Sequence, residues 1–437
     1  MRARITIFVL VLFLGLQSTL ILAQDGSLTC DGGPNDVVNA LRAAFDAGDL
    51  ETAQDLVTQA ERLCPAMSDR LPVVRVLAGR IEQQLNPEPT LAPEPELLLA
   101  EDGPYFASTQ TLMFSDSDRS GRTLAAEIVY PAIRPEDLST DRVEANVMPG
   151  VEPDTSNARY PLILFSHWWS SNASTDMELF AHLASHGFVV ASIEHSCDMS
   201  PTCLVDRPMD LLFVLDQLAK LDEGNLAEMI DTDQVGVMGI SFGGYTTLAT
   251  AGGRIDPDHF IAWAANEGSL RGCFGADEQL CWDAYVNNTV AAQWDEVAAY
   301  RAEFDALTQG EPWPSITDDR IRAVMPMVPS MGMLFGEHGL ESVAVPTLML
   351  AGTSDRLVPY EEQIVPMYAQ LNPDERTLIS LIRYRHHPEY EPKGSAYYKH
   401  FSTAFFGFYL QEEDYAEYFT ETYVNSFHDL TWGVYER

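Results

Sequence analysis

The sequence predicts an α/β fold, an open and mostly parallel sheet flanked by helices, with a helical insertion and a small helical domain ahead of it. From about residue 105, short apolar runs recur that have the length of strands buried on both faces. Helical stretches fall between most of these runs, as they do in parallel sheets. Residues 86–96, NPEPTLAPEPE, are rich in proline and glutamate and separate this pattern from the helical residues before it.

Each apolar run is expected to form one strand. The predicted strands are residues 123–132, 161–167, 188–195, 235–241, 260–266, 321–329, 346–352 and 377–384. Helical stretches between them include DMELFAHLASHG, PMDLLFVLDQLAKL and TTLATAGG. The alternation breaks at about 267–320, which predicts a helical, lid-like insertion longer than an ordinary connection.

The residues before the sheet predict export followed by a small helical domain. Residues 1–23 have a basic start and an apolar run ahead of a plausible cleavage site, as in a secretory signal peptide; a retained membrane anchor is the alternative. Residues 24–85 predict helices, either one tetratricopeptide-type hairpin or a disulfide-held cap. Residues 86–100 are then a linker, and 101–437 the main domain.

Net charge and cysteine content indicate which ligands the protein avoids and in which cellular compartment it folds. The formal net charge of −39 should repel nucleic acid and anionic lipid headgroups, and no second apolar run is long enough to span a bilayer. Six cysteines behind an export signal predict disulfides, and local pairing is the simplest scheme. No CxxC is present, so no metal site is predicted. The expected pairs are Cys30–Cys64, Cys197–Cys203 and Cys273–Cys281.

One short motif predicts a nucleophile. In VGVMGISFGGYTTLAT (235–250), Ser241 stands between two glycines where an apolar strand passes into a helix. This is the context of the GxSxG elbow, in which a sharp turn needs small neighbours and lifts the serine above the sheet. The helix N-terminus beside it favours developing negative charge. A tight packing turn is the alternative.

A serine nucleophile needs a base and an orienting carboxylate, which follow it in the chain in this architecture. Asp355, in the turn GTSDRLVP after an apolar strand, is the expected acid, and Glu267 is the alternate. The pair in IRYRHHPEY supplies the expected base. His387, one step further into the loop, is preferred, and His386 is the alternate.

The oxyanion hole should use two backbone N–H groups. One is expected from Phe242, directly after the nucleophile, and the other from the loop that begins at His167. Trp168 and Trp169 in that loop are large for an average turn. They are expected to form an apolar wall for a substrate group, with simple packing as the alternative.

These segments together resemble a known family. GISFGGYTTLAT, PLILFSHWW, FVVASIEH, RPMDLLFVLDQL, IRAVMPMVP and PTLMLAGTSDRLVP are similar to segments of secreted α/β-hydrolases related to dienelactone hydrolases and plasma-type platelet-activating-factor acetylhydrolases. The resemblance covers about 105–410 and implies the α/β-hydrolase fold.

The resemblance also implies a site. Ser241 would be the nucleophile, Asp355 the acid and His387 the base, with the N–H groups of Phe242 and Trp169 as the oxyanion hole.

The sequence departs from the family at three positions. Trp168 replaces a glycine that is common after the oxyanion-loop histidine, and Arg385-His386-His387 replaces a usual Gly-His. Serine stands at the elbow where true dienelactone hydrolases have cysteine, so their specific activity is not expected.

The function expected from the sequence is a secreted or extracytoplasmic serine hydrolase of carboxylic esters, lipase-like or esterase-like, without metal or organic cofactor. Its substrate would be a small-molecule or lipid ester, and the N-terminal helical domain could bind a protein partner. Stable membrane insertion after signal cleavage and nucleic-acid binding are not expected. A serine peptidase of the same fold and an inactive binding protein are the alternatives.

Overall fold

The computed structural model describes residues 43–44, 49–63, 93–136, 147–156, 159–197, 200–266, 289–372 and 374–436. The chain divides into two compact units, Met1–Pro93 and Glu94–Arg437. In the first, the structure describes helix α2 (Leu50–Leu63), with Ala53, Leu56 and Val57 buried along one face. The signal peptide predicted at 1–23 and most of the predicted helical domain lie outside the described residues, so both stay predictions.

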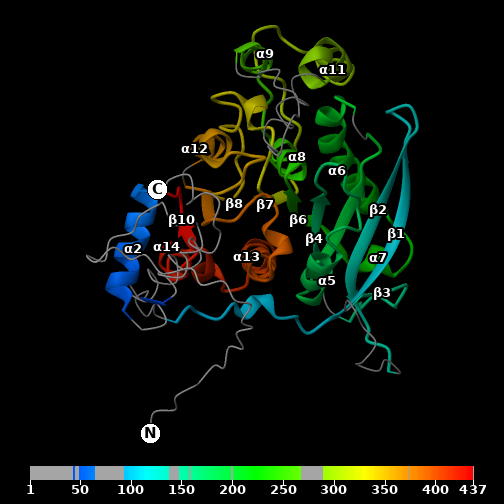
Figure 1. The fold of residues 1–437 in the computed structure, drawn as a ribbon. Helices are drawn as coiled ribbons and strands as arrows, with labels where there is room; N and C mark the ends of the chain where they lie inside the picture. The colour runs from blue at the N-terminus through cyan, green and yellow to red at the C-terminus, as the bar shows by residue number, and fades with distance from the viewer. Residues whose placement is uncertain are drawn as a thin grey trace, which may run out of the picture. The chain divides into compact units, whose positions relative to one another are not determined.

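Within the described residues of the second unit, ten strands form one mixed sheet in the order β10-β9-β8-β7-β6-β4-β5-β2-β1-β3 (Figure 1). Pairing is parallel from β5 across β4 to β9, and antiparallel for β2 with β5, β1 with β2 and β9 with β10. The strands are β1 (Phe106–Asp116), β2 (Arg122–Ala132), β3 (Val147–Pro149), β4 (Tyr160–Ser166), β5 (Val189–Glu194), β6 (Ile230–Ile240), β7 (Ile321–Met327), β8 (Thr347–Gly352), β9 (Arg376–Leu381) and β10 (Leu430–Trp432).

Helices cover both faces of the sheet. The α-helices of this unit are α5 (Met177–Ser185), α6 (Cys203–Ala219), α7 (Asn225–Met229), α8 (Phe242–Thr250), α9 (Pro257–Asn266), α11 (Trp294–Arg301), α12 (Val365–Gln370), α13 (Pro392–Gln411) and α14 (Glu421–Val424). Short 3-10 or π turns are η1 (Leu98–Ala100), η4 (Ala291–Gln293), η5 (Gly332–Phe335), η6 (Tyr360–Ile364), η7 (Pro388–Tyr390) and η8 (Ala416–Phe419).

Side chains of the central strands alternate between two apolar clusters. In β4, Leu162 and Leu164 join the cluster of α6 and α8, whereas Ile163 and Phe165 join that of α5 and α13. Figure 1 shows these two helix pairs on opposite sides of β4 and β6. The period of two puts both faces of each strand in the core, which explains why the strands are continuous apolar runs.

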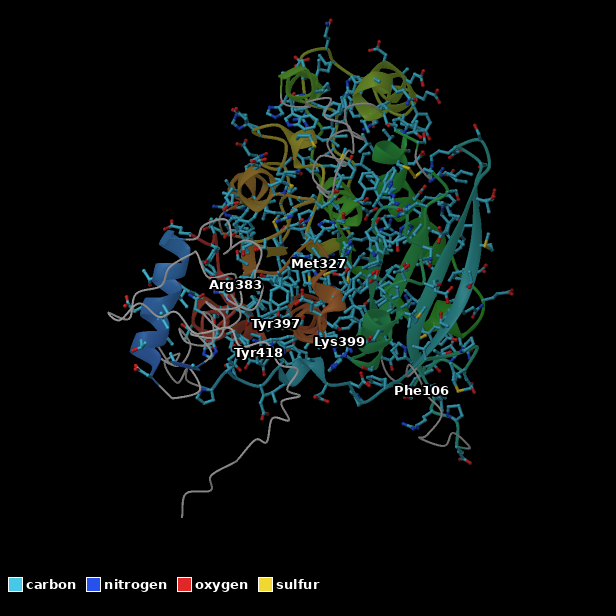
Figure 2. The ribbon with its side chains drawn as sticks, viewed as in Figure 1. Phe106, Met327, Arg383, Tyr397, Lys399 and Tyr418 are labelled. Atoms are coloured by element: carbon cyan, nitrogen blue, oxygen red, sulfur yellow. A yellow bond between two sulfur atoms is a disulfide. The ribbon has the colours of Figure 1, made fainter. Side chains whose placement is uncertain are left out.

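Helix α13 also contacts α5. Lys399 of α13 is ion-paired to Glu178 of α5 at 2.6 Å. Figure 2 shows Lys399 and Tyr397 of α13 together with Met327, the last residue of β7. Met327 and Tyr397 are fully buried in the same apolar cluster, so this helix supports the strand ends where the candidate site lies.

All predicted strands are present except 260–266. That prediction is wrong, because Pro257–Asn266 is the helix α9. The Asp256 side chain accepts a hydrogen bond from the His259 N–H at 3.0 Å, so this aspartate caps the helix ahead of a proline. Only Phe260 of the apolar run is fully buried, and Ile261 is half-exposed.

β1, β3 and β10 were not predicted from the sequence pattern. β1 has exposed and buried residues in mixed order because it lies near the edge of the sheet, and β3 and β10 are each three residues long. Of the lid-like insertion predicted at 267–320, the structure describes 289–320, which contains η4 and α11. Residues 267–288 lie outside the described ranges, so the lid stays a prediction.

The strand order places a topological switch point at the carboxyl end of β4. β5 pairs with one side of β4 and β6 with the other, so the chain reverses its direction across the sheet at β4. In open α/β sheets, ligands bind at such a switch point. The loop after β4 and the turn after β6 therefore meet there.

Candidate active site

Ser241 occupies the turn between β6 and α8. Its φ of 57° and ψ of −112° are strained for a residue other than glycine. The Ser241 N–H donates to the Met327 carbonyl at 2.9 Å, and the Ser241 carbonyl accepts from the Ser330 N–H at 3.0 Å. The end of β7 therefore holds the turn on both sides.

The two glycines of the motif allow three backbone segments to approach closely. A Cβ at Gly243 would lie 1.8 Å from the Ser166 carbonyl oxygen, and one at Gly239 would lie 2.5 Å from the Gly243 carbonyl oxygen. Any side chain here would therefore push α8 away from the end of β4. The glycines bring the serine turn against the loop that follows β4.

Three side chains form a hydrogen-bonded chain at this turn. His386 Nε2 lies 2.8 Å from Ser241 Oγ, and His386 Nδ1 lies 2.7 Å from Asp355 Oδ2. Since a carboxylate accepts, Nδ1 carries the proton and Nε2 accepts from the serine hydroxyl. The other carboxylate oxygen, Asp355 Oδ1, accepts from the N–H groups of Leu357 and Val358 at 2.8 and 2.9 Å. The arrangement can remove a proton from Ser241.

The preference for His387 over His386 is wrong. His387 Nδ1 lies 2.7 Å from Glu389 Oε1, and the centroids of the His387 and Trp168 rings lie 5.2 Å apart in a T-shaped arrangement. Burial lowers the pKa of His387, but the hydrogen bond and charge of Glu389 outweigh this effect and raise it above its ordinary value. His387 therefore lies beside the site, whereas His386 reaches Ser241.

Contacts between the β8 and β9 loops decide which histidine points inward. The Ser354 N–H donates to the Tyr384 carbonyl at 2.9 Å, and the Arg383 N–H donates to Thr353 Oγ1 at 2.9 Å. A Cβ at Gly352 would lie 2.5 Å from the Tyr384 carbonyl oxygen. Arg383 itself has a φ of 70°. This left-handed turn is not visible in the sequence pattern, and it shifts the inward position to His386.

The residues expected at the oxyanion hole lie beside the nucleophile. The Trp169 and Phe242 rings meet edge to face at 5.2 Å, which brings the loop after β4 next to the first residue of α8. Trp168 and Trp169 are both half-buried, so each keeps part of its ring accessible. The structure therefore places Trp169 against Phe242, directly after Ser241, and Trp168 against His387.

A partly buried carboxyl group, that of Asp176, lies near His387. Burial, and then the charge of Glu389, raise the pKa of Asp176 to about 7. Asp176 precedes α5, whereas Glu389 follows the histidine pair. A group that titrates near neutral pH therefore lies close to the candidate site.

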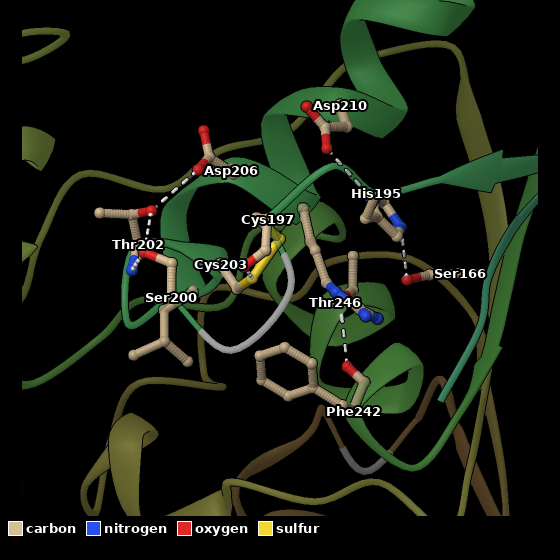
Figure 3. Close-up of a disulfide and its surroundings, with 12 residues drawn as sticks. Ser166, His195, Cys197, Ser200, Thr202, Cys203, Asp206, Asp210, Phe242 and Thr246 are labelled. Atoms are coloured by element: carbon tan, nitrogen blue, oxygen red, sulfur yellow. Dashed lines mark hydrogen bonds and ion pairs between the residues drawn. A yellow bond between two sulfur atoms is a disulfide. The ribbon is translucent and has the colours of Figure 1, made fainter. Parts of the chain in front are cut away.

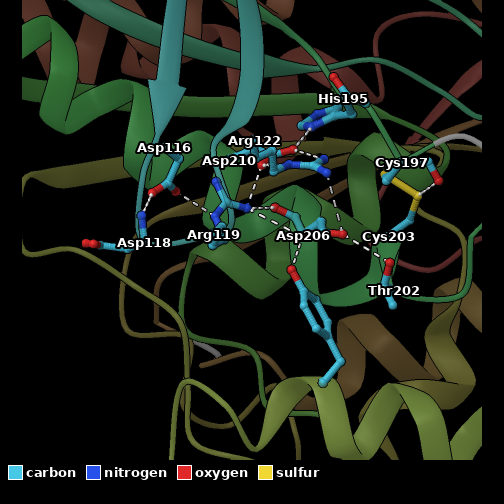
Figure 4. A network of polar contacts seen from close by, with 12 residues as sticks. Asp116, Asp118, Arg119, Arg122, His195, Cys197, Thr202, Cys203, Asp206 and Asp210 are labelled. Carbon is cyan, nitrogen blue, oxygen red and sulfur yellow. Dashed lines mark hydrogen bonds and ion pairs between the residues drawn. A yellow bond between two sulfur atoms is a disulfide. The ribbon is translucent and has the colours of Figure 1, made fainter.

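A second buried polar network, not predicted from the sequence, lies next to the end of β4. His195 Nε2 lies 3.0 Å from Ser166 Oγ, and His195 Nδ1 lies 2.9 Å from Asp210 Oδ2 (Figure 3). Arg119 and Arg122 pair with Asp210 at 2.6 and 2.9 Å (Figure 4). The available signal was the set of charged residues inside the apolar helix CLVDRPMDLLFVLDQLA.

Electrostatics keep this network in one protonation state. Burial, and then the charge of Arg207, lower the pKa of His195 to about 4. Burial acts to raise the pKa of Asp210, but hydrogen bonds from His195 and Arg122 lower it to about 2. The histidine is thus neutral and the aspartate charged over the ordinary pH range, so Ser166 donates to His195.

The predicted Cys197–Cys203 disulfide is present, with its Cα atoms 5.4 Å apart. Cys30, Cys64, Cys273 and Cys281 lie outside the described residues. So does the alternate acid Glu267, and the strand on which that alternative rested is the helix α9. Within the described ranges, no group of three or more metal-ligating side chains occurs.

Residues 152–265 match a family model described as PET hydrolase-like. The matched segment contains β4, β5 and β6 with their helices, and includes Ser241, whereas Asp355 and His386 lie beyond it. The match and the mixed sheet flanked by helices support an α/β-hydrolase with serine ester hydrolase activity in general. A search of curated proteins returned no match. The finer resemblance to dienelactone hydrolases and platelet-activating-factor acetylhydrolases stays a prediction.

Proposed function

We propose that this protein is a secreted esterase that cleaves carboxylic esters through an acyl-enzyme on Ser241. The observation that carries the proposal is the hydrogen-bonded chain from Ser241 through His386 to Asp355, with distances of 2.8 and 2.7 Å. The chain begins at a strained strand-to-helix turn, as a nucleophile elbow requires. The PET hydrolase-like match over the same turn supports ester chemistry.

The chemistry follows from the geometry. Ser241 Oγ attacks the ester carbonyl carbon while its proton passes to His386 Nε2, and Asp355 stabilises the imidazolium. The tetrahedral oxyanion accepts hydrogen bonds from the N–H groups of Phe242 and Trp169. The alcohol leaves with the proton from His386. Water then loses a proton to His386 and attacks the acyl carbon. The new tetrahedral intermediate collapses, the bond to Ser241 Oγ breaks, His386 returns the proton to Ser241 Oγ, and the acid is released.

Three aromatic side chains near Ser241 and His387 are proposed to contact the substrate. Trp168 and Trp169, which are half-buried, flank the serine turn and offer apolar surface to an acyl or alcohol group. Tyr390 is 63% exposed, and its ring lies 5.4 Å from that of His387. An apolar ester, rather than a charged one, fits these side chains.

Secretion is part of the proposal. Residues 1–23 have the composition of a signal peptide, and a disulfide such as Cys197–Cys203 persists in oxidising compartments. Among the described residues, no helix is long and apolar enough to cross a membrane. A protein partner for the N-terminal helical domain stays a prediction.

Labelling of the purified protein with a fluorophosphonate probe tests the proposal, with Ser241→Ala as the comparison. We expect labelling of the native protein alone, and a loss of ester turnover in the variant of roughly 10³-fold or more. Circular dichroism checks that the variant is folded. A panel of p-nitrophenyl esters of increasing acyl length, a short-chain phospholipid and an aromatic polyester film then defines the substrate. Folded native protein that neither labels nor turns over any ester would be an inactive binding protein.

A further inference from the structure

Arg207, in α6, contacts residues of both segments that form the proposed oxyanion hole. Its Nη1 donates to the His167 carbonyl at 2.6 Å, and its guanidinium carbon lies 4.7 Å from the centroid of the Phe242 ring. His167 directly precedes Trp168 and Trp169. Phe242 directly follows the nucleophile. Arg207 is only 2% exposed, and the contacts described here are to protein groups.

The segment that presents Arg207 is itself rigidly held. The Cys197–Cys203 disulfide fixes the first residue of α6 (Figure 3), and Arg207 follows about one helical turn later in the same helix. Asp206, the preceding residue, accepts from the Tyr300 hydroxyl at 2.6 Å and from Thr202 Oγ1 at 3.1 Å. The guanidinium therefore extends from a fixed point.

Two anchors from this region hold consecutive residues at the end of β4. His195 binds the Ser166 hydroxyl, and Arg207 binds the His167 carbonyl. A second nucleophile at Ser166 is ruled out by burial, because Ser166, His195 and Asp210 are 0%, 1% and 0% exposed. The role left for this network is to hold the loop.

Fixing the His167 carbonyl matters because a peptide unit is planar. The same peptide unit contains the Trp168 N–H. The hydrogen bond from Arg207 therefore fixes the plane of this peptide unit, and with it the direction in which the chain enters Trp168 and Trp169. Stacking on Phe242 limits movement of the first residue of α8 in the same way. An oxyanion hole is effective only while its donors stay about 2.7–3.1 Å from the developing charge.

We propose that Arg207 is a positioning residue that fixes the spacing between the two walls of the oxyanion hole, Phe242 and the loop after β4. This inference rests on the proposed esterase function. Arg207 acts through the His167 carbonyl and the Phe242 ring, and it touches no reacting atom. Loss of the guanidinium should therefore weaken binding of the transition state much more than binding of the ester.

The test compares Arg207→Met and Arg207→Lys with Arg301→Met. Arg301 is a matched control, since it is 1% exposed and contacts Pro314 and Asp305 instead. Each variant is assayed for kcat and KM with p-nitrophenyl butyrate. Inhibition by an alkyl trifluoromethyl ketone, which forms a tetrahedral oxyanion adduct with an active serine, is measured beside it. Fluorophosphonate labelling to completion counts the folded sites.

For Arg207→Met we expect kcat to fall about 10–100-fold with KM within about threefold, and the ketone inhibition constant to rise by a similar factor. Arg207→Lys, which keeps a donor but lacks the planar face that stacks on Phe242, should lose about 5–20-fold. Arg301→Met should keep kcat and the inhibition constant within about threefold. A residue that only stabilises the fold changes the number of folded sites, and neither constant changes once the rates are divided by that number.

Three results would overturn the inference: unchanged kcat and ketone inhibition in Arg207→Met, a change confined to KM, or an equal loss in Arg301→Met. If Arg207→Met does not fold, a folded Arg207→Lys with native kcat also overturns it. If the native protein shows neither labelling nor turnover, both the proposed function and this inference are refuted. If the native protein is active and Arg207→Met is equally active, only this inference is refuted and the proposed function stands.

Discussion

Replacing each histidine of the adjacent pair by glutamine tests the assignment of the base. His386 is 4% exposed and lies within 2.8 Å of Ser241 and 2.7 Å of Asp355. Glutamine is similar in size and can hydrogen-bond, but it cannot accept the proton that the serine must lose. His386→Gln should therefore keep the fold and remove general-base catalysis.

The expected magnitudes differ strongly between the two variants. Loss of one member of such a unit lowers kcat roughly 10⁴-fold or more. The His387 side chain is 32% exposed, and its ion pair with Glu389 is of a kind worth about 0–1 kcal/mol. His387→Gln should then change kcat by less than about tenfold. The ratio between the variants is at least about 10³, or about 4 kcal/mol of transition-state stabilisation.

The assay is the initial rate of p-nitrophenyl butyrate hydrolysis at saturating ester, with both variants purified in parallel. Circular dichroism and thermal unfolding confirm that each variant is folded. Ser241→Ala sets the background from any contaminating esterase. The reasoning is refuted if His387→Gln is the inactive variant, or if His386→Gln keeps kcat within about tenfold of the native value.

Two further predictions concern stability. Gly243→Ala would place a methyl group 1.8 Å from the Ser166 carbonyl oxygen, and it should lower the free energy of unfolding by about 1–3 kcal/mol in urea titration; native stability would contradict the close approach. The raised pKa of Asp176, about 7 in the folded state against 3.8, means that its contribution to stability is present below about pH 4 and is lost as pH rises through 7. As the pH rises from about 4 to about 8, the free energy of unfolding of Asp176→Asn should therefore increase by about 2–4 kcal/mol relative to that of the native protein. A difference that does not change with pH would contradict the shift.

Local patterns predicted the strands of the sheet because strands buried on both faces must be continuous apolar runs. They failed at 260–266, where the length of an apolar run cannot separate strand from helix. The capping aspartate and the proline before that run were the signal that should have decided it. They also failed for β1, because an antiparallel strand near a sheet edge needs no continuous apolar run.

The sequence by itself picked out Ser241 and Asp355, because each stands in a short turn directly after a buried strand, and such turns leave a local pattern of glycine, serine and aspartate. Only the tertiary structure decided between His386 and His387, because the choice depends on a left-handed Arg383 and on hydrogen bonds between the β8 and β9 loops. Only the tertiary structure brought Arg207 onto both His167 and Phe242. Contacts between residues distant in sequence set these positions, and such contacts leave no mark in the spacing of residues along the chain.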